Sequence, residues 1–154
     1  MKSIMFVLGF ILLTTAAFAQ LKRPAPPQKK IDTLRLSCPL AKGKILALPK
    51  DGYRFKDDLK AVIKSTTDTL FLAPVDGKID LITRGDGGKY EIVMHYFNYN
   101  IWITGISEMM VKKNDKMKKG QAIGKIKPGD EVEILLFDDE EPVDPVKYLE
   151  CSKE

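Results

Sequence analysis

Two acidic residues near the end of the chain, Glu131 and Glu133, have the types and spacing that could bind a cation. They lie in the segment 131–137 (EVEILLF), whose length and apolar content predict a strand. Side chains alternate along a strand, so residues two apart point to the same face. Two carboxylates there could hold a hard cation such as calcium. The interpretation that we favour is a solvent-facing acidic pair matched to nearby lysines.

Histidine, the most versatile catalytic side chain, occurs once in the whole chain, as His95. Zinc-dependent hydrolysis needs about three nitrogen, sulfur or oxygen ligands, an open position for water and a base within hydrogen-bond reach. We interpret His95 as a half-buried or loop residue, because no partners for a ligand role are apparent. The residue types therefore argue against a zinc cofactor and against hydrolytic catalysis.

Aromatic residues gather around the segment 96–102, where Tyr96, Tyr99 and Trp102 accompany Phe97. On a hairpin such residues pack across strands in the core. They can also form a stacking surface for a sugar or a peptide. Both interpretations stay open at the level of sequence.

The first residues predict export. Residues 1–19 combine a lysine near the start, an apolar run over 4–13 and the small-x-small sequence Ala17–Ala19 typical of a signal peptidase site. The apolar run is shorter than the roughly 20 residues that a bilayer-spanning helix needs, which disfavours a membrane anchor. We expect cleavage near Ala19 and a mature protein in the periplasm or outside the cell. Residues 20–30, rich in proline and basic residues, predict an extended linker.

Export changes the interpretation of the two cysteines, Cys38 and Cys151. In an oxidising compartment an even pair is more often bonded than free. We expect a disulfide that ties the start of the domain to its end, with two unpaired thiols as the alternative.

Length and composition fit one domain over residues 31–154. The chain has 154 residues, of which 44% are hydrophobic and 30% charged, enough for a single core. The formal net charge is +4, but lysines and acids alternate through most of the chain, so we do not expect nucleic-acid binding. The local basic cluster over 112–119 is interpreted as a solvated edge, with contact to an anionic polymer as the alternative.

Short strand patterns separated by turn signals predict an all-β fold, a small sandwich or barrel-sandwich hybrid of short antiparallel strands. Segment 57–65 is ambiguous between helical spacing and strand composition, and we favour strand. Asp76-Gly77 and the loop 84–88 predict turns, the latter joining a hairpin, and 115–124 predicts another hairpin.

The order of these segments resembles the LytM-type (lysostaphin-like) zinc metallopeptidase domain. The resemblance rests on three motifs in order: residues 73–77 (APVDG), 111–124 (VKKNDKMKKGQAIG) and 141–149 (EPVDPVKYL). Each motif alone is weak, since similar turns occur in biotinyl and lipoyl carrier domains. Their order and spacing cover most of the chain from Leu48 to Leu149.

The resemblance implies positions for zinc ligands and catalytic histidines, and this chain lacks the expected residue at each of them. The implied ligand positions are occupied by Asp58, Val62 and Glu133. The implied assisting positions are occupied by Gly105 and Glu131. The resemblance therefore implies a degenerate member of the family.

Three functions remain open. We favour an inactive LytM-like domain that works as a binding or regulatory module of the cell envelope, associated with peptidoglycan or with a cell-wall hydrolase. An active peptidoglycan endopeptidase with a non-standard metal site is the first alternative. A structural domain of the biotinyl or adaptor type is the second, and the predicted export signal disfavours it.

Overall fold

The computed structural model describes residues 34–47 and 59–153. The predicted signal peptide, the linker 20–30 and Asp58 lie outside the described residues. Within them the chain forms short strands and two 3-10 turns, η2 (Asp86–Gly88) and η3 (Pro145–Lys147). The strands are β1 (Leu36–Ser37), β2 (Lys44–Ile45), β3 (Ala61–Lys64), β4 (Leu70–Leu72), β5 (Gly77–Arg84), β6 (Tyr90–Tyr96), β7 (Tyr99–Ile106), β8 (Glu108–Met109), β9 (Lys116–Met117), β10 (Ala122–Lys125), β11 (Glu131–Asp138), β12 (Glu141–Val143), β13 (Leu149–Glu150) and β14 (Ser152–Lys153).

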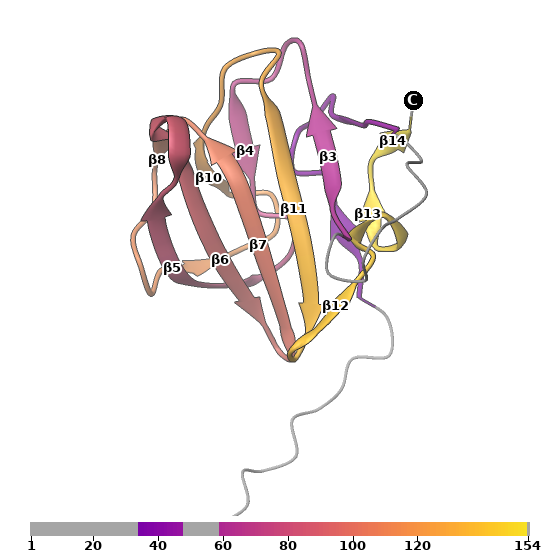
Figure 1. Cartoon of the computed structure of the whole chain (residues 1–154). Helices are drawn as coiled ribbons and strands as arrows, with labels where there is room; N and C mark the ends of the chain where they lie inside the picture. Colours follow the sequence, from indigo (N-terminus) through magenta and orange to yellow (C-terminus); the bar gives the residue numbers. More distant parts are fainter. Residues whose placement is uncertain (1–33, 48–58, 154) are drawn as a thin grey trace, which may run out of the picture.

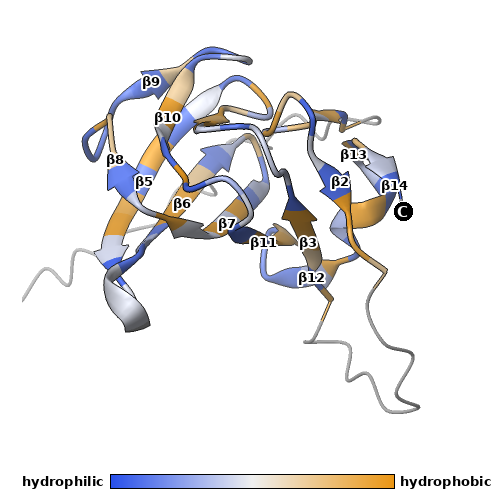
Figure 2. Ribbon diagram, turned by 90° about the horizontal axis from the view of Figure 1, so that it is seen from above, coloured by the Kyte–Doolittle hydropathy of each residue, from blue (hydrophilic) through white to orange (hydrophobic). Residues whose placement is uncertain are grey.

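The larger layer is a curved sheet in the order β14-β2-β3-β11-β7-β6-β5-β9, with β12 added to β11 (Figure 1). Its centre is the antiparallel run β5, β6, β7, β11 and β3. The expected hairpin across the 84–88 loop is confirmed, since β5 pairs with β6. The ambiguous segment is a strand as well, and β3 is hydrophobic until Lys64 (Figure 2).

The smaller layer is the sheet β4-β10-β8, which lies behind the large sheet in Figure 1. Alternation along the strands decides which side chains enter the space between the layers. On β7, for example, Ile101 and Ile103 are fully buried whereas Trp102 is exposed. The core between the layers also contains Phe71 of β4 and Ile123 of β10, both fully buried. The fold is thus nearly all-β, and its sheets do not close into a barrel.

Both ends of the described domain are held together. The Cys38–Cys151 disulfide forms as expected, joining residues 113 positions apart. Next to it β1 pairs with β13 and β2 with β14, and both pairs are parallel. The other strand pairs among the described residues are antiparallel, as expected. The two pairs at this edge differ because the first and last described strands run alongside each other in the same direction.

Two predicted turns join strands of different layers. The segment 115–124 does turn, with Gln121 N–H donating to the Lys118 carbonyl at 2.9 Å. Its flanking strands do not pair with each other, because β9 pairs with β5 and β10 pairs with β4 and β8. The predicted hairpin was wrong here, since a turn signal fixes the reversal of the chain but not the layer that receives the next strand. Asp76-Gly77 behaves in the same way, because β4 and β5 belong to different sheets.

No helix among the described residues is long and apolar enough to cross a membrane.

Candidate functional site

The face of the large sheet that points away from the core carries the positions singled out by sequence. Strand register places Val62, Glu133, Thr104, Glu91 and Thr83 in one row across β3, β11, β7, β6 and β5. Directly opposed residues of antiparallel strands project from the same face. Four of the five implied family positions therefore come together at this row or beside it, and the fifth, Asp58, lies outside the described residues.

The two glutamates are already paired with Lys60, which immediately precedes β3, and with Lys64, which ends β3. Glu133 Oε1 lies 2.9 Å from Lys60 Nζ, and Glu131 Oε1 lies 3.3 Å from Lys64 Nζ. The expected acidic pair matched to lysines is present. These ion pairs are partly exposed, so each contributes at most about 1 kcal/mol to folding. A cation at this place would compete with both ammonium groups for the carboxylates.

Gly105 occupies a backbone conformation that no imidazole-bearing residue could adopt without strain. Its φ is +104°, and a Cβ added there would lie 2.6 Å from the carbonyl oxygen of Glu131. A pocket of about 230 Å³ beside it is lined by Gly105, Glu131, Glu133, Thr104 and Lys89 among others. The pocket occupies the space where the resemblance implies an assisting histidine. The backbone conformation at this position favours glycine, because an added Cβ would contact the Glu131 carbonyl oxygen.

The one remaining implied position among the described residues, Val62, offers no metal ligand. Val62 is apolar and buried, with 4% of its surface exposed. Across the described part of the chain, no three histidine, cysteine, aspartate or glutamate residues gather closely enough to hold a metal. These side chains do not fit the tetrahedral nitrogen and carboxylate set of a catalytic zinc site.

His95 lies away from this row. Its Nδ1 is 3.0 Å from Asn100 Oδ1, and the residue is half-buried, as expected. It follows Glu91 by four positions on β6, which separates the two by about 13 Å along the strand. His95 therefore cannot share a ligand with Glu131 or Glu133.

The aromatic residues of the β6–β7 hairpin divide between surface and core. Trp102 is 41% exposed and its ring lies 6.3 Å from that of Phe137. Tyr96 is half-buried and packs edge-on against Phe97. Tyr99 is only 5% exposed and belongs to the core, so its assignment to a binding surface was wrong. Three positions separate it from Trp102, and alternation sends the two side chains to opposite faces.

Burial in the core also affects the acidity of Tyr99. Desolvation of the phenolate, followed by the negative charge of Asp138, raises the pKa of Tyr99 above its ordinary value of 10.0. The hydroxyl therefore remains neutral at physiological pH, as suits a packed residue.

A stripe of apolar side chains beside the Glu133 row was missed by sequence reasoning. Register aligns Leu81, Val93, Trp102 and Leu135 across β5, β6, β7 and β11; these four residues are called the apolar stripe below. Leu81 is 37% exposed. Finding the stripe from sequence would have required the register of every strand pair, including the irregularity between Ile79 and Leu81.

Comparison with known proteins gives similarity at the level of structure alone. No family model matches the sequence, and no curated protein matches it. Among solved structures, Csd3 from Helicobacter pylori has a TM-score of 0.63 at 19% identity, covering 78% of this chain and 34% of that one. This chain thus spans about a third of the length of Csd3.

Two further structures are similar over much of the chain. A putative M23 peptidase from Pseudomonas aeruginosa gives a TM-score of 0.60 at 19% identity, covering 76% of this chain and 51% of that one. A chain of the SpoIIQ–SpoIIIAH pore-forming complex gives 0.58 at 14% identity, covering 76% of this chain and 92% of that one. With the sequence motifs and the two-layer architecture, these similarities show that the chain has the fold of a LytM-type (M23) peptidase domain.

Proposed function

We propose that this chain is an exported LytM-like domain that binds a protein of the cell envelope and does not hydrolyse peptidoglycan. The observation that carries the proposal is the pairing of Glu133 with Lys60 and of Glu131 with Lys64. Glu133 occupies a position where the resemblance implies a zinc ligand, and Glu131 one where it implies an assisting histidine. A catalytic zinc site is built mainly from imidazole ligands around an open position for water, and here carboxylates that pair with lysines stand in place of the imidazoles.

The geometry of Gly105 supports loss of catalysis independently. An assisting histidine at this position would need a Cβ within 2.6 Å of the Glu131 carbonyl oxygen. Restoring the side chain therefore requires the β7 and β11 backbones to move apart. The chain therefore differs from the implied catalytic site in its backbone at Gly105 as well as in its side chains at Glu131 and Glu133.

Support for a binding role comes from the apolar stripe. Its members project from the face that carries the Glu133 row, and Trp102 and Leu81 are both more than one-third exposed. Val93 lies between them and is buried, so the stripe presents two exposed apolar side chains beside the charged pairs. Tryptophan is enriched among residues that dominate binding energy in protein contacts. The similar SpoIIQ–SpoIIIAH chain comes from a complex between two proteins, which favours a protein partner over a glycan.

Support for export comes from the signal-like sequence of residues 1–19 and from the Cys38–Cys151 bond. Structural disulfides form and persist in oxidising compartments such as the periplasm and the extracellular space. We place the mature domain there.

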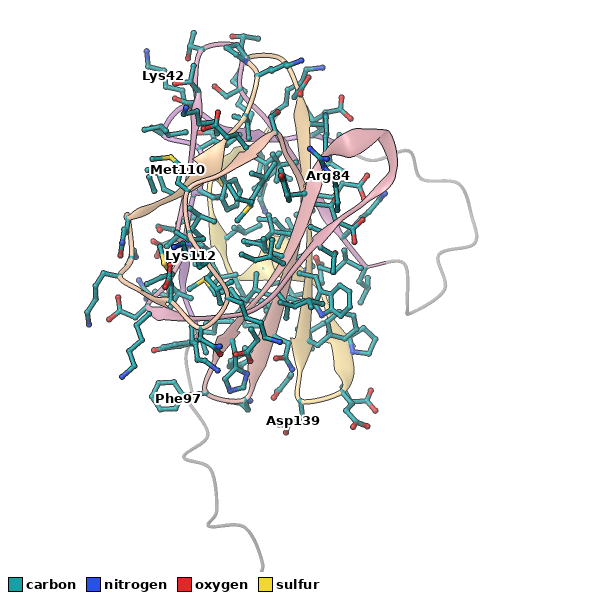
Figure 3. The ribbon with its side chains drawn as sticks, turned by 90° about the vertical axis from the view of Figure 1, so that its left-hand side faces the viewer. Lys42, Arg84, Phe97, Met110, Lys112 and Asp139 are labelled. Carbon is teal, nitrogen blue, oxygen red and sulfur yellow. A yellow bond between two sulfur atoms is a disulfide. The ribbon has the colours of Figure 1, made fainter. Side chains whose placement is uncertain are left out.

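Site-specific photo-crosslinking tests the binding role. A photoreactive amino acid replaces Trp102 in one variant and Met110, which is 51% exposed and lies outside the stripe, in a control variant (Figure 3). In intact envelopes we expect a discrete protein adduct at position 102 and none at position 110.

The purified partner should then bind the unmodified chain, with at least tenfold weaker affinity for Trp102→Ala and unchanged affinity for Met110→Ala. Equal losses for the two variants, or crosslinking to glycan alone, would overturn the assignment of this face to a protein partner.

A further inference from the structure

A second pocket lies at the other end of the large sheet, far from the Glu133 row. It has a volume of about 570 Å³ and lies where β5 begins, β6 ends and β9 passes alongside. From Gly77 to Gly85 the chain runs eight residues, so roughly 25 Å of strand separates this pocket from the one beside Gly105. Its size falls within the range of about 300–1,000 Å³ common for small-molecule sites.

One wall of the pocket is aromatic. Tyr96 and Phe97 line it, and their rings meet edge to face at 4.7 Å. Phe97 is 46% exposed, and its ring projects from the end of the molecule (Figure 3). An exposed ring of this kind offers a stacking surface with an apolar face and little conformational freedom to lose.

Phe97 has a backbone conformation that is unusual for a bulky residue. Its φ is +54°, in a region that glycine, asparagine and aspartate occupy readily and that bulky residues avoid. The hairpin turn would be more easily formed with a small residue at this position. Strain of this kind gathers at ligand-binding sites, where contact by the side chain compensates for it.

The rim of the pocket is basic. Lys78, Lys116 and Lys118 line it together with one acid, Asp76, so positive charge is in excess. Lys78 pairs with Asp80 at 2.8 Å, and Lys118 pairs with Asp76 at 3.0 Å. Within the described ranges Lys116 makes no ion pair, so its ammonium group is available to an anion.

His95 also lines the pocket and adds a polar ring to it. Its Nδ1 is engaged by Asn100 Oδ1, which leaves Nε2 for a ligand. When Nδ1 carries the proton and donates it to the amide oxygen, Nε2 can accept a hydrogen bond from a hydroxyl.

We propose that this pocket binds a carboxylated sugar. The sugar ring stacks on the exposed face of Phe97, which Tyr96 supports edge-on from behind. The carboxylate lies against Lys116 and Lys118, and a ring hydroxyl donates to His95 Nε2. Carboxylate recognition by lysine and ring stacking on aromatics are independent contacts, so a ligand that combines both chemistries is favoured over a neutral sugar or a simple anion. The site shares no residue with the apolar stripe and does not depend on the function proposed for that face.

Titration followed by NMR tests the proposal on the full mature chain, with methyl glucuronoside and methyl glucoside as probes. These sugars differ only in carrying a carboxylate or a hydroxymethyl group. We expect saturable shifts at Phe97, His95 and Lys116 with the acidic sugar, at least tenfold weaker binding of the neutral one, and no shift at Trp102. Raising the salt concentration should weaken binding of the acidic sugar.

Variants of the pocket sharpen the test. Lys116→Ala and Phe97→Asn should each weaken binding at least fivefold, and asparagine is chosen because it tolerates the positive φ of this turn. Lys112→Ala, a lysine of the same segment outside the pocket lining, should leave binding unchanged. Equal affinity for the two sugars, absence of saturable binding, or equal losses for Lys112→Ala and Lys116→Ala would overturn the proposal.

Discussion

At the scale of single residues, Gly105 differs from the catalytic pattern in its backbone conformation as well as in its missing side chain. A missing histidine could be restored by one substitution if the backbone still accepted it. Here φ is +104° and the Glu131 carbonyl oxygen occupies the place of a Cβ. Left-handed backbone costs a residue with a side chain roughly 1–2 kcal/mol, and the close contact adds to that cost.

Substitution at Gly105 should therefore destabilise the fold more than substitution at other glycines with positive φ. We expect Gly105→Ala to lower the free energy of unfolding by about 2–4 kcal/mol. Gly120→Ala is the matched control, because Gly120 has φ of +82° but nothing within 4 Å of its added Cβ. Urea unfolding measures both, and equal losses for the two variants would show that the Glu131 contact is not restrictive.

At the scale of elements, the Asp76 carboxylate connects the turn after β4 to the turn before β10. It accepts a hydrogen bond from Lys119 N–H at 2.8 Å and forms an ion pair with Lys118 Nζ at 3.0 Å. The backbone hydrogen bond first, and then the lysine, hold the pKa of Asp76 below its ordinary value of 3.8. Two segments that cross between the layers are thereby held together.

This contact should give the chain a specific acid sensitivity. Because the folded state binds the Asp76 proton less readily than the unfolded state, the contact is complete above pH 3.8 and is lost as pH falls through the lowered pKa. We expect Asp76→Ala to lower the melting temperature at pH 7, and the difference from the unmodified chain to shrink below pH 3.8. Asp80→Ala removes only a side-chain ion pair and should have a smaller effect at pH 7. A pH-independent difference for Asp76→Ala would contradict this assignment.

The same elements show how far sequence could predict this fold. Alternation and turn chemistry predicted β6, β7 and β11 and the hairpin between β5 and β6, because these depend on neighbours in the chain. The partners of β9 and β10 were not predictable, since they depend on which layer the chain enters after Gly120. The apolar stripe escaped notice for a similar reason, because it exists only once four strands are aligned. The glutamates were recognised from sequence, but the strain at Gly105 depends on where β11 passes.

At the scale of the whole molecule, the Cys38–Cys151 bond joins the two ends of the domain across 113 residues. The strands beside it, β1 with β13 and β2 with β14, pair over only two residues each. Such short pairings contribute little cooperativity alone, so the covalent bond should hold this edge closed.

Removing the bond should therefore lower stability strongly. On the chain-entropy model a loop of this length contributes about 5 kcal/mol, which corresponds to a fall in melting temperature of roughly 15–30 °C for a domain of this size. The Cys38→Ser/Cys151→Ser double variant, compared by calorimetry with the oxidised chain, measures the effect. A shift below about 5 °C would mean that the strand pairs close this edge without the bond.

The whole molecule also presents two separate surfaces, one across the middle of the β5–β6 pair and one at its Gly77–Tyr96 end. One surface is the apolar stripe with its paired glutamates, assigned to an envelope protein. The other is the basic and aromatic pocket at Phe97, assigned to a carboxylated sugar.

The most direct test of the central claim is release of soluble fragments from purified peptidoglycan by the mature chain in the presence of zinc, followed by chromatography. We predict no release above that of buffer, because Glu131 and Glu133 are paired with lysines and Gly105 cannot carry a catalytic side chain. An active lysostaphin-type enzyme in the same assay confirms that the substrate is cleavable. Fragments that appear with this chain and disappear on addition of a chelator would contradict the account.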